Sequence, residues 1–352
     1  MTPFRQLDAL PAGFLDWPAS ALARELGAPT LIHLPGRREP ALFVSVLMHG
    51  NEPTGWHAVQ ALLRDHAGRE LPRALSLFIG NVEAAAQNRR FLPDQPDFNR
   101  VWPGTDLHDH PVARMLAEVT GIMRARSVFA SVDIHNNTGL NPHYGCVNHP
   151  GAGYLQLATL FSRTVVYFLR PRGVQSMAFG EFTPAVTLEC GRPDDAAGIA
   201  HAREYLESCL RLAEVPDSPV AAHDIDLFHT IATVKVPDGV GFGFGTHDQT
   251  LNLAADADRL NFRELPAGTE LGRVAGGQGL PLDVRDEFGA DVAAQLFALD
   301  ECRLVTRRNL MPSMLTLDTR VVRQDCLCYL MERLPDAAGV ARHGPAECPV
   351  PQ

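Results

Sequence analysis

A histidine and a glutamate three residues apart, His49 and Glu52, stand where an apolar run of the sequence ends. Imidazole and carboxylate are ordinary ligands of Zn²⁺, and a catalytic zinc site needs three protein ligands and an open position for water. The run before them, Leu42 to Met48, is typical of a strand buried on both faces. Ligands bind at the carboxyl ends of such strands, so the pair indicates a metal site. The alternative is that Glu52 and Thr54 cap a helix.

The spacing of this pair is a weak signal when taken alone. The sequence contains 14 histidines and 41 acidic residues, so pairs at this spacing arise by chance. The two other pairs are His201/Glu204, on a helix-like segment, and His223/Asp226, and neither follows a predicted buried strand. The prediction therefore depends on the position of His49 and Glu52 at the end of a strand.

A second strand-like run ends in a histidine within residues 131–139, where His135 follows Asp133 by two positions. Residues two apart lie on the same face of a strand. A carboxylate on that face can accept a hydrogen bond from the second ring nitrogen of a metal-bound histidine. Two strand ends that each carry a histidine favour a metal site. The alternative for His135 is a strand-end histidine before an Asn-Asn turn.

Two further stretches supply groups for proton transfer and anion binding. Glu189 ends another apolar run, and a carboxylate is costly there unless it has a partner or a function. Beside a zinc-bound water it would be a general base. The Pro-rich loop 88–104 carries Arg90, Asn99 and Arg100, which are suited to a carboxylate or a developing oxyanion.

Strand-like and helix-like segments alternate through residues 30–215, which predicts an α/β fold with a mixed, mostly parallel sheet flanked by helices. The predicted strands are Thr30 to Leu34, Leu42 to Met48, Leu75 to Asn81, Ser127 to Ile134, Thr164 to Leu169 and Ala185 to Glu189. The predicted helices are Thr54 to His66, Val112 to Arg126, Tyr154 to Arg163 and Asp194 to Glu214.

The pattern of predicted elements changes at the Pro-rich stretch 215–219, which is the best candidate for a linker. Beyond it, short alternating segments, including "MLTLDTRVV" at 314–322, predict a smaller β-rich domain, with a helix only at Ala290 to Phe297. We therefore expect a catalytic α/β domain at 1–215, a β-rich capping domain at 219–335 and a loose tail at 336–352.

The composition narrows the classes of partner and compartment. The net charge is −10 and no Lys/Arg stripe is present, which argues against nucleic acid as a partner. No apolar window is long enough for a membrane span, and no signal peptide is visible. Seven scattered cysteines fit a reducing cytoplasm. We therefore expect a cytoplasmic protein that does not bind a membrane, and the sequence leaves open whether it forms a homo-oligomer.

Four ordered motifs resemble the succinylglutamate desuccinylase/aspartoacylase family of the zinc carboxypeptidase superfamily, which has an HxxE…H ligand set. The motifs are His49-Gly50-Asn51-Glu52, Asp97-Phe98-Asn99-Arg100, Asp133-Ile134-His135-Asn136 and Thr187-Leu188-Glu189-Cys190-Gly191. The likeness covers residues 40–195 and extends more weakly into the C-terminal part. It implies a zinc carboxypeptidase-like fold with a β-rich capping domain.

The resemblance also implies a role for each matching residue. His49, Glu52 and His135 would hold one zinc ion per chain, and Glu189 would take a proton from the zinc-bound water and pass it to the leaving amine. Arg90 would stabilise the oxyanion, with Arg89 as the alternative. A small, carboxylate-bearing substrate would be bound by the group Asn99, Arg100 and Asn136.

One departure from the family pattern concerns specificity. Aspartoacylases use a further arginine shortly before the catalytic glutamate, and the residues before Glu189 contain none. Arg170, Arg172 and Arg192 are the candidates that could replace it. The resemblance implies a zinc-dependent amidohydrolase that removes an acyl group from a small N-acyl amino acid. The alternatives are a metallocarboxypeptidase for small peptides and a zinc-stabilised binding module without activity, and another divalent metal could replace zinc.

Overall fold

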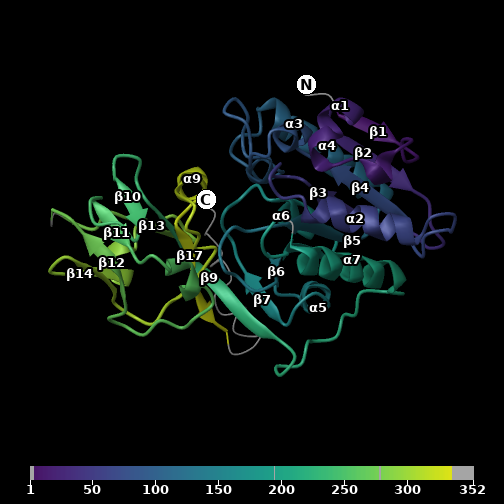
Figure 1. The fold of residues 1–352 in the computed structure, drawn as a ribbon. Coiled ribbons are helices and arrows are strands. Elements are labelled where there is room, and N and C mark those ends of the chain that lie inside the picture. The colour runs from purple at the N-terminus through teal and green to yellow at the C-terminus, as the bar shows by residue number, and fades with distance from the viewer. Residues whose placement is uncertain (1–3, 194, 277–278, 335–352) are drawn as a thin grey trace, which may run out of the picture.

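Two β-sheets organise the chain in the computed structural model, which describes residues 4–193, 195–276 and 279–334. The larger sheet runs through both lobes seen in Figure 1, and the smaller one lies wholly in the C-terminal lobe. Within the described residues the larger sheet has twelve strands, in the order β1-β2-β4-β3-β5-β8-β6-β7-β9-β17-β16, with β13 also paired to β9. The predicted α/β architecture with a second, smaller sheet is confirmed.

The strands of the larger sheet before residue 215 are β1 (Arg5–Leu7), β2 (Thr30–Leu34), β3 (Ala41–Val46), β4 (Leu75–Ile79), β5 (Val128–His135), β6 (Tyr144–Val147), β7 (Thr164–Tyr167) and β8 (Ala185–Glu189). The neighbours β4-β3-β5-β8 are parallel, whereas β2 runs antiparallel to β4 and β6 antiparallel to β8. The parallel centre places the carboxyl ends of β3, β5 and β8 at one edge.

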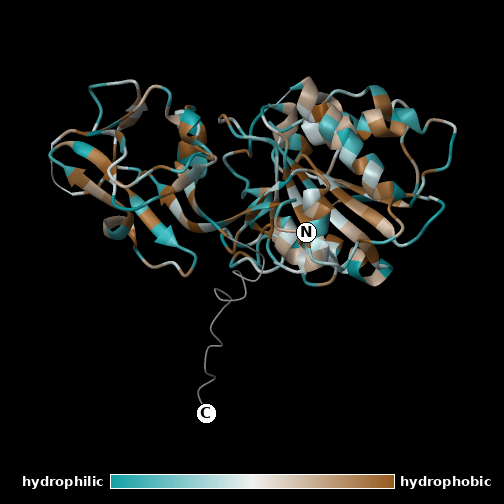
Figure 2. Cartoon of the chain, turned by 90° about the horizontal axis from the view of Figure 1, so that it is seen from below, coloured by the Kyte–Doolittle hydropathy of each residue, from teal (hydrophilic) through white to brown (hydrophobic). Residues whose placement is uncertain are grey.

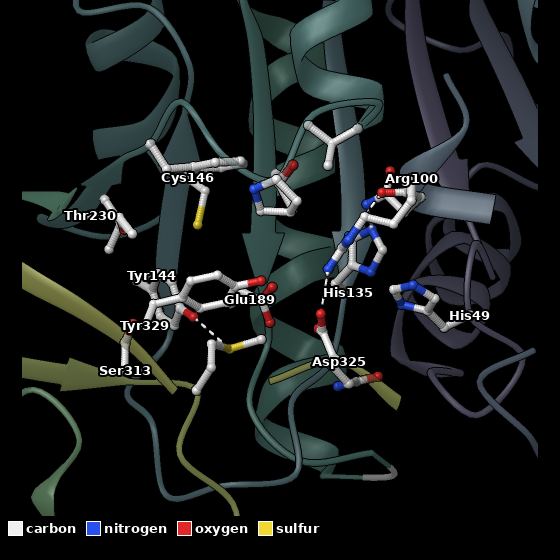
Figure 3. Close-up of a pocket in the computed structure, with 18 of the residues that line it drawn as sticks. His49, Arg100, His135, Tyr144, Cys146, Glu189, Thr230, Ser313, Asp325 and Tyr329 are labelled. Atoms are coloured by element: carbon white, nitrogen blue, oxygen red, sulfur yellow. Dashed lines mark hydrogen bonds and ion pairs between the residues drawn. The ribbon is translucent and has the colours of Figure 1, made fainter. Parts of the chain in front are cut away.

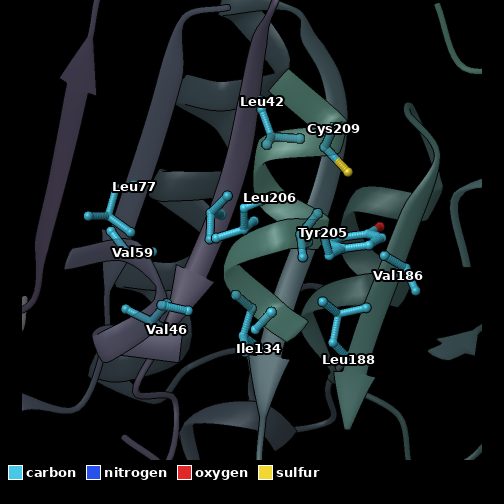
Figure 4. Packing of buried hydrophobic residues seen from close by; sticks show 14 of the residues in the cluster. Leu42, Val46, Val59, Leu77, Ile134, Val186, Leu188, Tyr205, Leu206 and Cys209 are labelled. Carbon is cyan, nitrogen blue, oxygen red and sulfur yellow. The ribbon is translucent and has the colours of Figure 1, made fainter. Parts of the chain in front are cut away.

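Helices cover both faces of this sheet. They are α1 (Leu22–Leu26), α2 (Thr54–Asp65), α3 (Val82–Ala86), α4 (Pro111–Arg126), α5 (Ala152–Thr159), α6 (Gln175–Gly180) and α7 (Ala196–Arg211). Successive residues of β3 alternate between the faces: Leu42 and Val44 pack in the cluster that contains α2 and α7, while Phe43 packs with α4 and α6. Figure 4 shows Leu206 of α7 over this strand. Each such buried side chain contributes about 1.5–3 kcal/mol.

The predicted elements of this part are largely confirmed, with shifts at their ends. The strands at 30–34 and 185–189 match, whereas the strand predicted to reach Met48 ends at Val46 because Leu47 turns the chain with φ +56°. The short elements β6, α3 and α6 were not predicted. The helix predicted from Asp194 is α7, which begins at Ala196; Asp194 itself lies outside the described residues.

The C-terminal lobe has its own core and the smaller sheet, made of β10 (Phe242–Phe244), β11 (Leu251–Leu253), β12 (Glu270–Val274), β15 (Arg303–Thr306) and β14 (Phe297–Asp300). Apolar residues follow the strands of both lobes in Figure 2. The helix predicted at 290–297 is reduced to α8 (Ala293–Leu296). The strand-like interpretation of 314–322 is wrong. Strand β16 ends at Ser313, and Asp318 accepts a hydrogen bond from the Arg320 amide and starts α9 (Thr319–Gln324).

Strand β9 (Asp226–Lys235) belongs to both lobes. Residues 226–229 of β9 pair in parallel with β7, and residues 232–235 pair with β13 (Asp283–Asp286). Residues 228–234 pair with β17 (Cys328–Arg333), which pairs in turn with β16 (Met311–Ser313). The predicted linker at 215–219 precedes this shared strand, and the domain division stays a prediction. The predicted tail at 336–352 lies outside the described residues. No helix in the described part of the chain is both long and apolar enough to cross a membrane.

Candidate active site

The loop after β3 brings His49 and Glu52 together. His49 Nδ1 lies 2.8 Å from Glu52 Oε1, and both side chains are buried. Gly50 makes this loop compatible with its surroundings, because a Cβ there would lie 2.1 Å from the backbone nitrogen of Ala85 in α3. Helix α2 begins at Thr54 without a side-chain cap from the preceding residue. Both oxygens of the Glu52 carboxylate face histidines, Oε1 toward His49 and Oε2 toward His135, which contradicts the alternative that Glu52 caps a helix.

His135, the last residue of β5, approaches the same carboxylate from the neighbouring strand. Its Nδ1 lies 2.7 Å from Glu52 Oε2, and the two imidazole rings of His49 and His135 are 5.0 Å apart. Burial works to raise the pKa of Glu52, but His49 and His135 outweigh it and hold the pKa well below its usual range. The three predicted ligands thus lie together, and Glu52 stays ionised between the two rings.

An aspartate contacts the Nε2 atom of each histidine, on the side of the ring away from Glu52. His49 Nε2 lies 2.9 Å from Asp97 Oδ1, and His135 Nε2 lies 2.7 Å from Asp133 Oδ2. The Ser45 hydroxyl donates to Asp133 over 2.6 Å and fixes that carboxylate. If each Nε2 donates to its aspartate, each Nδ1 keeps its lone pair for a metal ion. The sequence prediction that Asp133 could serve a histidine in this way agrees with the observed contact.

The donor set suits a divalent metal ion. The ligand atoms of His49, Glu52 and His135 all lie within 4.8 Å of one another, and in the described part of the chain this is the cluster that could hold an ion. Burial works to lower the pKa of His135, but Asp133 and Glu52 raise it well above its usual range, so the site favours positive charge. Two imidazoles and one carboxylate are a ligand set typical of catalytic zinc.

Glu189 ends β8 beside His135, with which it is in register across the β5–β8 ladder. Asn137 Nδ2 donates to Glu189 Oε2 over 3.4 Å. Burial raises the pKa of Glu189 to about 7, partly offset by His135. A carboxyl group with a pKa near neutrality can both accept and return a proton under ordinary conditions. Figure 3 shows this side chain between the histidines and the far wall of the cavity.

The loop at 88–104 directs one of its two neighbouring arginines into the site. Arg89 is exposed, whereas Arg90 is buried with Nη1 3.7 Å from Glu52 Oε1. Its Nε and Nη2 donate to Asp97 over 3.0 and 2.9 Å. The edge of the guanidinium that carries Nε and Nη2 is therefore anchored by Asp97, and Nη1 is directed toward Glu52. The geometry selects Arg90 over Arg89 by position.

Asp325, between α9 and β17, lies against both arginines of the loop. Its carboxylate accepts from Arg90 Nη2 over 3.3 Å and from Arg100 Nη2 over 3.0 and 3.1 Å. Burial works to raise the pKa of Asp325, but Arg100 and Arg90 hold it below its usual value. The C-terminal part of the chain thus contributes an ionised group to the site, which the sequence did not indicate.

The two asparagines predicted to bind substrate make hydrogen bonds to protein groups. Asn99 Nδ2 donates to Asp133 over 3.1 Å and its Oδ1 accepts from the Gln175 amide. Asn136 donates to Thr54 Oγ1 and the Gly191 carbonyl, and its Oδ1 accepts from the Thr54 amide. These contacts give both residues a positioning role, and their substrate contacts stay predictions.

Of the three arginines considered for a second carboxylate, the structure places Arg170 in the wall of the cavity. Arg172 is exposed, and Arg192 lies 3.6 Å from Asp258. The cavity holds about 680 Å³ of empty space, part of it open to solvent. The sequence did not indicate the wall residues Tyr144, Cys146, Val166, Phe168, Ser313, Met314 and Tyr329.

Residues 38–211 match the model of the succinylglutamate desuccinylase/aspartoacylase catalytic domain. Together with the fold and the clustered ligands, this match defines a deacylase of that type. The chain belongs to the succinylglutamate desuccinylase/aspartoacylase family, whose members hydrolyse amide bonds, and the resemblance predicted from the four motifs is confirmed.

Solved structures share the fold at low sequence identity. Succinylglutamate desuccinylase from Chromobacterium violaceum is 18% identical, with 88% of this chain and 90% of that chain covered and a TM-score of 0.56. The Rhodobacter sphaeroides succinylglutamate desuccinylase/aspartoacylase has 16% identity, coverage of 86% and 88%, and a TM-score of 0.57. Murine aminoacylase 3 has 16% identity, coverage of 84% and 97%, and a TM-score of 0.56. No curated protein matches the chain by sequence.

Proposed function

We propose that the chain is a zinc-dependent amidohydrolase that releases the acyl group of a small, carboxylate-bearing N-acyl amino acid. The observation that supports it best is the convergence of His49, Glu52 and His135 next to Glu189. These three residues would hold one zinc ion per chain. When bound, zinc would acidify a water molecule and polarise the scissile carbonyl.

Glu189 is the group that moves protons in this proposal. Its carboxylate takes one proton from the attacking water, whose oxygen bonds to the carbonyl carbon. It then gives that proton to the amide nitrogen as the C–N bond breaks, so the products are a carboxylic acid and a free amine. The pKa of about 7, raised by burial, suits both transfers. Asn137 holds the carboxylate in place through its amide.

Arg90 provides the positive charge for the tetrahedral oxyanion. Its Nη1 is directed toward Glu52, while Asp97 and Asp325 hold the rest of the guanidinium. A donor that is already oriented in a buried site requires little reorganisation during the reaction. The ion pairs of Arg90 therefore support a role in stabilising the transition state.

The size of the cavity favours deacylation over trimming of long peptides. Ser313, Met314, Asp325 and Tyr329 of the C-terminal part line the same cavity as the metal ligands. The cavity has about 680 Å³ of empty space, which suits a ligand the size of an acyl amino acid. We expect the same side chains to obstruct a peptide of more than three residues. A metallocarboxypeptidase for small peptides remains the alternative, and comparing hydrolysis of the two substrate types separates them.

The test combines metal content with release of amines from a panel of N-acyl amino acids. We expect one zinc per chain and hydrolysis of at least one panel member. Glu189→Gln should keep the zinc and lose about 10²–10⁴-fold in kcat. The matched control is Glu181→Gln, which changes an exposed glutamate and should leave kcat unchanged. A zinc-loaded protein that hydrolyses nothing in the panel would contradict the proposal.

A further inference from the structure

One wall of the cavity is apolar. Tyr144, Cys146, Val166, Phe168 and Met314 line it, and they belong to one hydrophobic cluster with Phe228, Phe262, Met311 and Met331. Figure 3 shows Tyr144 and Cys146 across the cavity from His49 and His135. Such a wall gains binding free energy from apolar ligand surface and offers no charge to a carboxylate.

Met314 is fixed over this wall. The Tyr144 hydroxyl donates to its sulfur over 2.9 Å, and Asn141 Oδ1 accepts from its backbone amide over 2.9 Å. Its φ is +61°, a conformation that side chains larger than glycine adopt rarely. Residues held in such conformations cluster at ligand sites. The Met314 side chain is therefore held in a defined position in the cavity wall.

The two arginines on the opposite side already have carboxylate partners. Arg90 and Arg100 carry two positive charges, and Asp97 and Asp325 lie within hydrogen-bond distance of them with two negative ones. A substrate carboxylate would have to displace Asp325 to reach the shared position. This side of the cavity consequently offers little to a second substrate carboxylate.

Arg170 is the lining arginine without a carboxylate partner among the described residues. Its Nε donates to the Glu287 carbonyl over 2.7 Å, which leaves the terminal nitrogens for a ligand. One guanidinium can bind one carboxylate through two parallel hydrogen bonds. The cavity therefore combines one available cation with one apolar wall.

We infer that the site takes N-acyl amino acids with a single carboxylate, bound by Arg170, and an apolar group, bound against Tyr144, Phe168 and Met314. This inference rests on the proposed function. Derivatives with two or more carboxylates, such as N-acetylaspartate or N-succinylglutamate, are poor ligands because the additional charge has no partner and must lose its water.

The test measures binding and hydrolysis separately. Calorimetry on zinc-loaded Glu189→Gln compares N-acetyl-leucine and N-acetyl-phenylalanine with N-acetylaspartate and N-succinylglutamate. We expect the apolar ligands to bind about 100-fold more tightly, which is the discrimination that an apolar pocket reaches against a ligand with an added polar group. Amine release by the unmodified chain follows the same four compounds.

Two substitutions locate the subsites. Arg170→Gln should weaken binding of every carboxylate ligand about tenfold, whereas Arg172→Gln, a change of the same charge two residues away, should have no effect. Met314→Lys keeps an unbranched side chain and adds a cation, so it should narrow or reverse the preference for apolar ligands. Tighter binding of the dicarboxylates by the parent, or equal effects of the two arginine variants, would overturn the inference. Apolar preference in binding without any hydrolysis would instead overturn only the proposed function.

Discussion

Asp325 lies 3.0 Å from Arg100, although 225 residues separate the two in the chain. This ion pair joins the segment before β17 to the loop that also carries Arg90. Its removal leaves the partly buried Arg100 without its carboxylate partner, while Arg90 keeps Asp97. Loss of one partner of such an ion pair destabilises proteins. We expect Asp325→Asn to lower the free energy of unfolding by about 2–3 kcal/mol in urea titrations. Asp65→Asn, which removes an exposed partner of Arg203, should change it by less than about 1 kcal/mol.

The same ion pair predicts a dependence of stability on pH. Arg100 and Arg90 hold the pKa of Asp325 below its usual value despite burial, which opposes them. A carboxyl group of this kind stabilises the fold fully above its unfolded pKa of about 3.9, and the contribution is lost as pH falls through the folded value. Melting temperatures measured between about pH 5 and pH 2 should therefore fall more steeply for the parent chain than for Asp325→Asn. Parallel curves would show that Asp325 does not contribute in this way.

The aspartate behind each histidine should control metal affinity. Asp133→Asn removes the charge next to His135 Nε2, and comparable contacts elsewhere are worth about 10–100-fold in affinity. Zinc competition with a chromophoric chelator measures this change directly. Ser45→Ala, which removes only the hydroxyl that donates to Asp133, should have a smaller effect. Unchanged zinc affinity in Asp133→Asn would show that this carboxylate does not support the metal site.

Gly50 and Gly121 should respond oppositely to the same substitution. A Cβ at Gly50 would lie 2.1 Å from the Ala85 nitrogen, so Gly50→Ala should destabilise the chain by about 2–3 kcal/mol and reduce zinc binding. Gly121 lies exposed in α4 with nothing within 4 Å of its Cβ position. Gly121→Ala should therefore stabilise by about 0.5–1 kcal/mol. Urea unfolding of both variants, with zinc content, checks the pair.

The two histidines of the proposed metal site and Glu189 could be predicted because each follows a local pattern. His49, His135 and Glu189 stand at the ends of apolar runs, and parallel strands bring such ends to one edge of a sheet. The family resemblance then supplied the expected role of each residue. Arg90 was separated from Arg89 only by its burial, which neither pattern nor resemblance determines.

The opposite side of the cavity could not be predicted. Met314 and Asp325 reach it because β16 and β17 pair with one another and with β9, and such long-range pairing leaves no local signal. The strand β6, which supplies Tyr144 and Cys146, has only four residues and includes Gly145. We therefore expect substrate specificity to depend on the cavity wall formed by β6 and the C-terminal part, which the periodicity of the sequence does not predict.

Strand β9 has a mechanical consequence. Because one continuous strand forms backbone ladders with β7 in one lobe and with β13 and β17 in the other, a rigid rotation of the lobes would break those ladders. We therefore expect no hinge motion between the two lobes at β9. The cavity that both lobes line would then keep a nearly constant width, and we expect exchanges of its lining side chains to decide which ligands it admits.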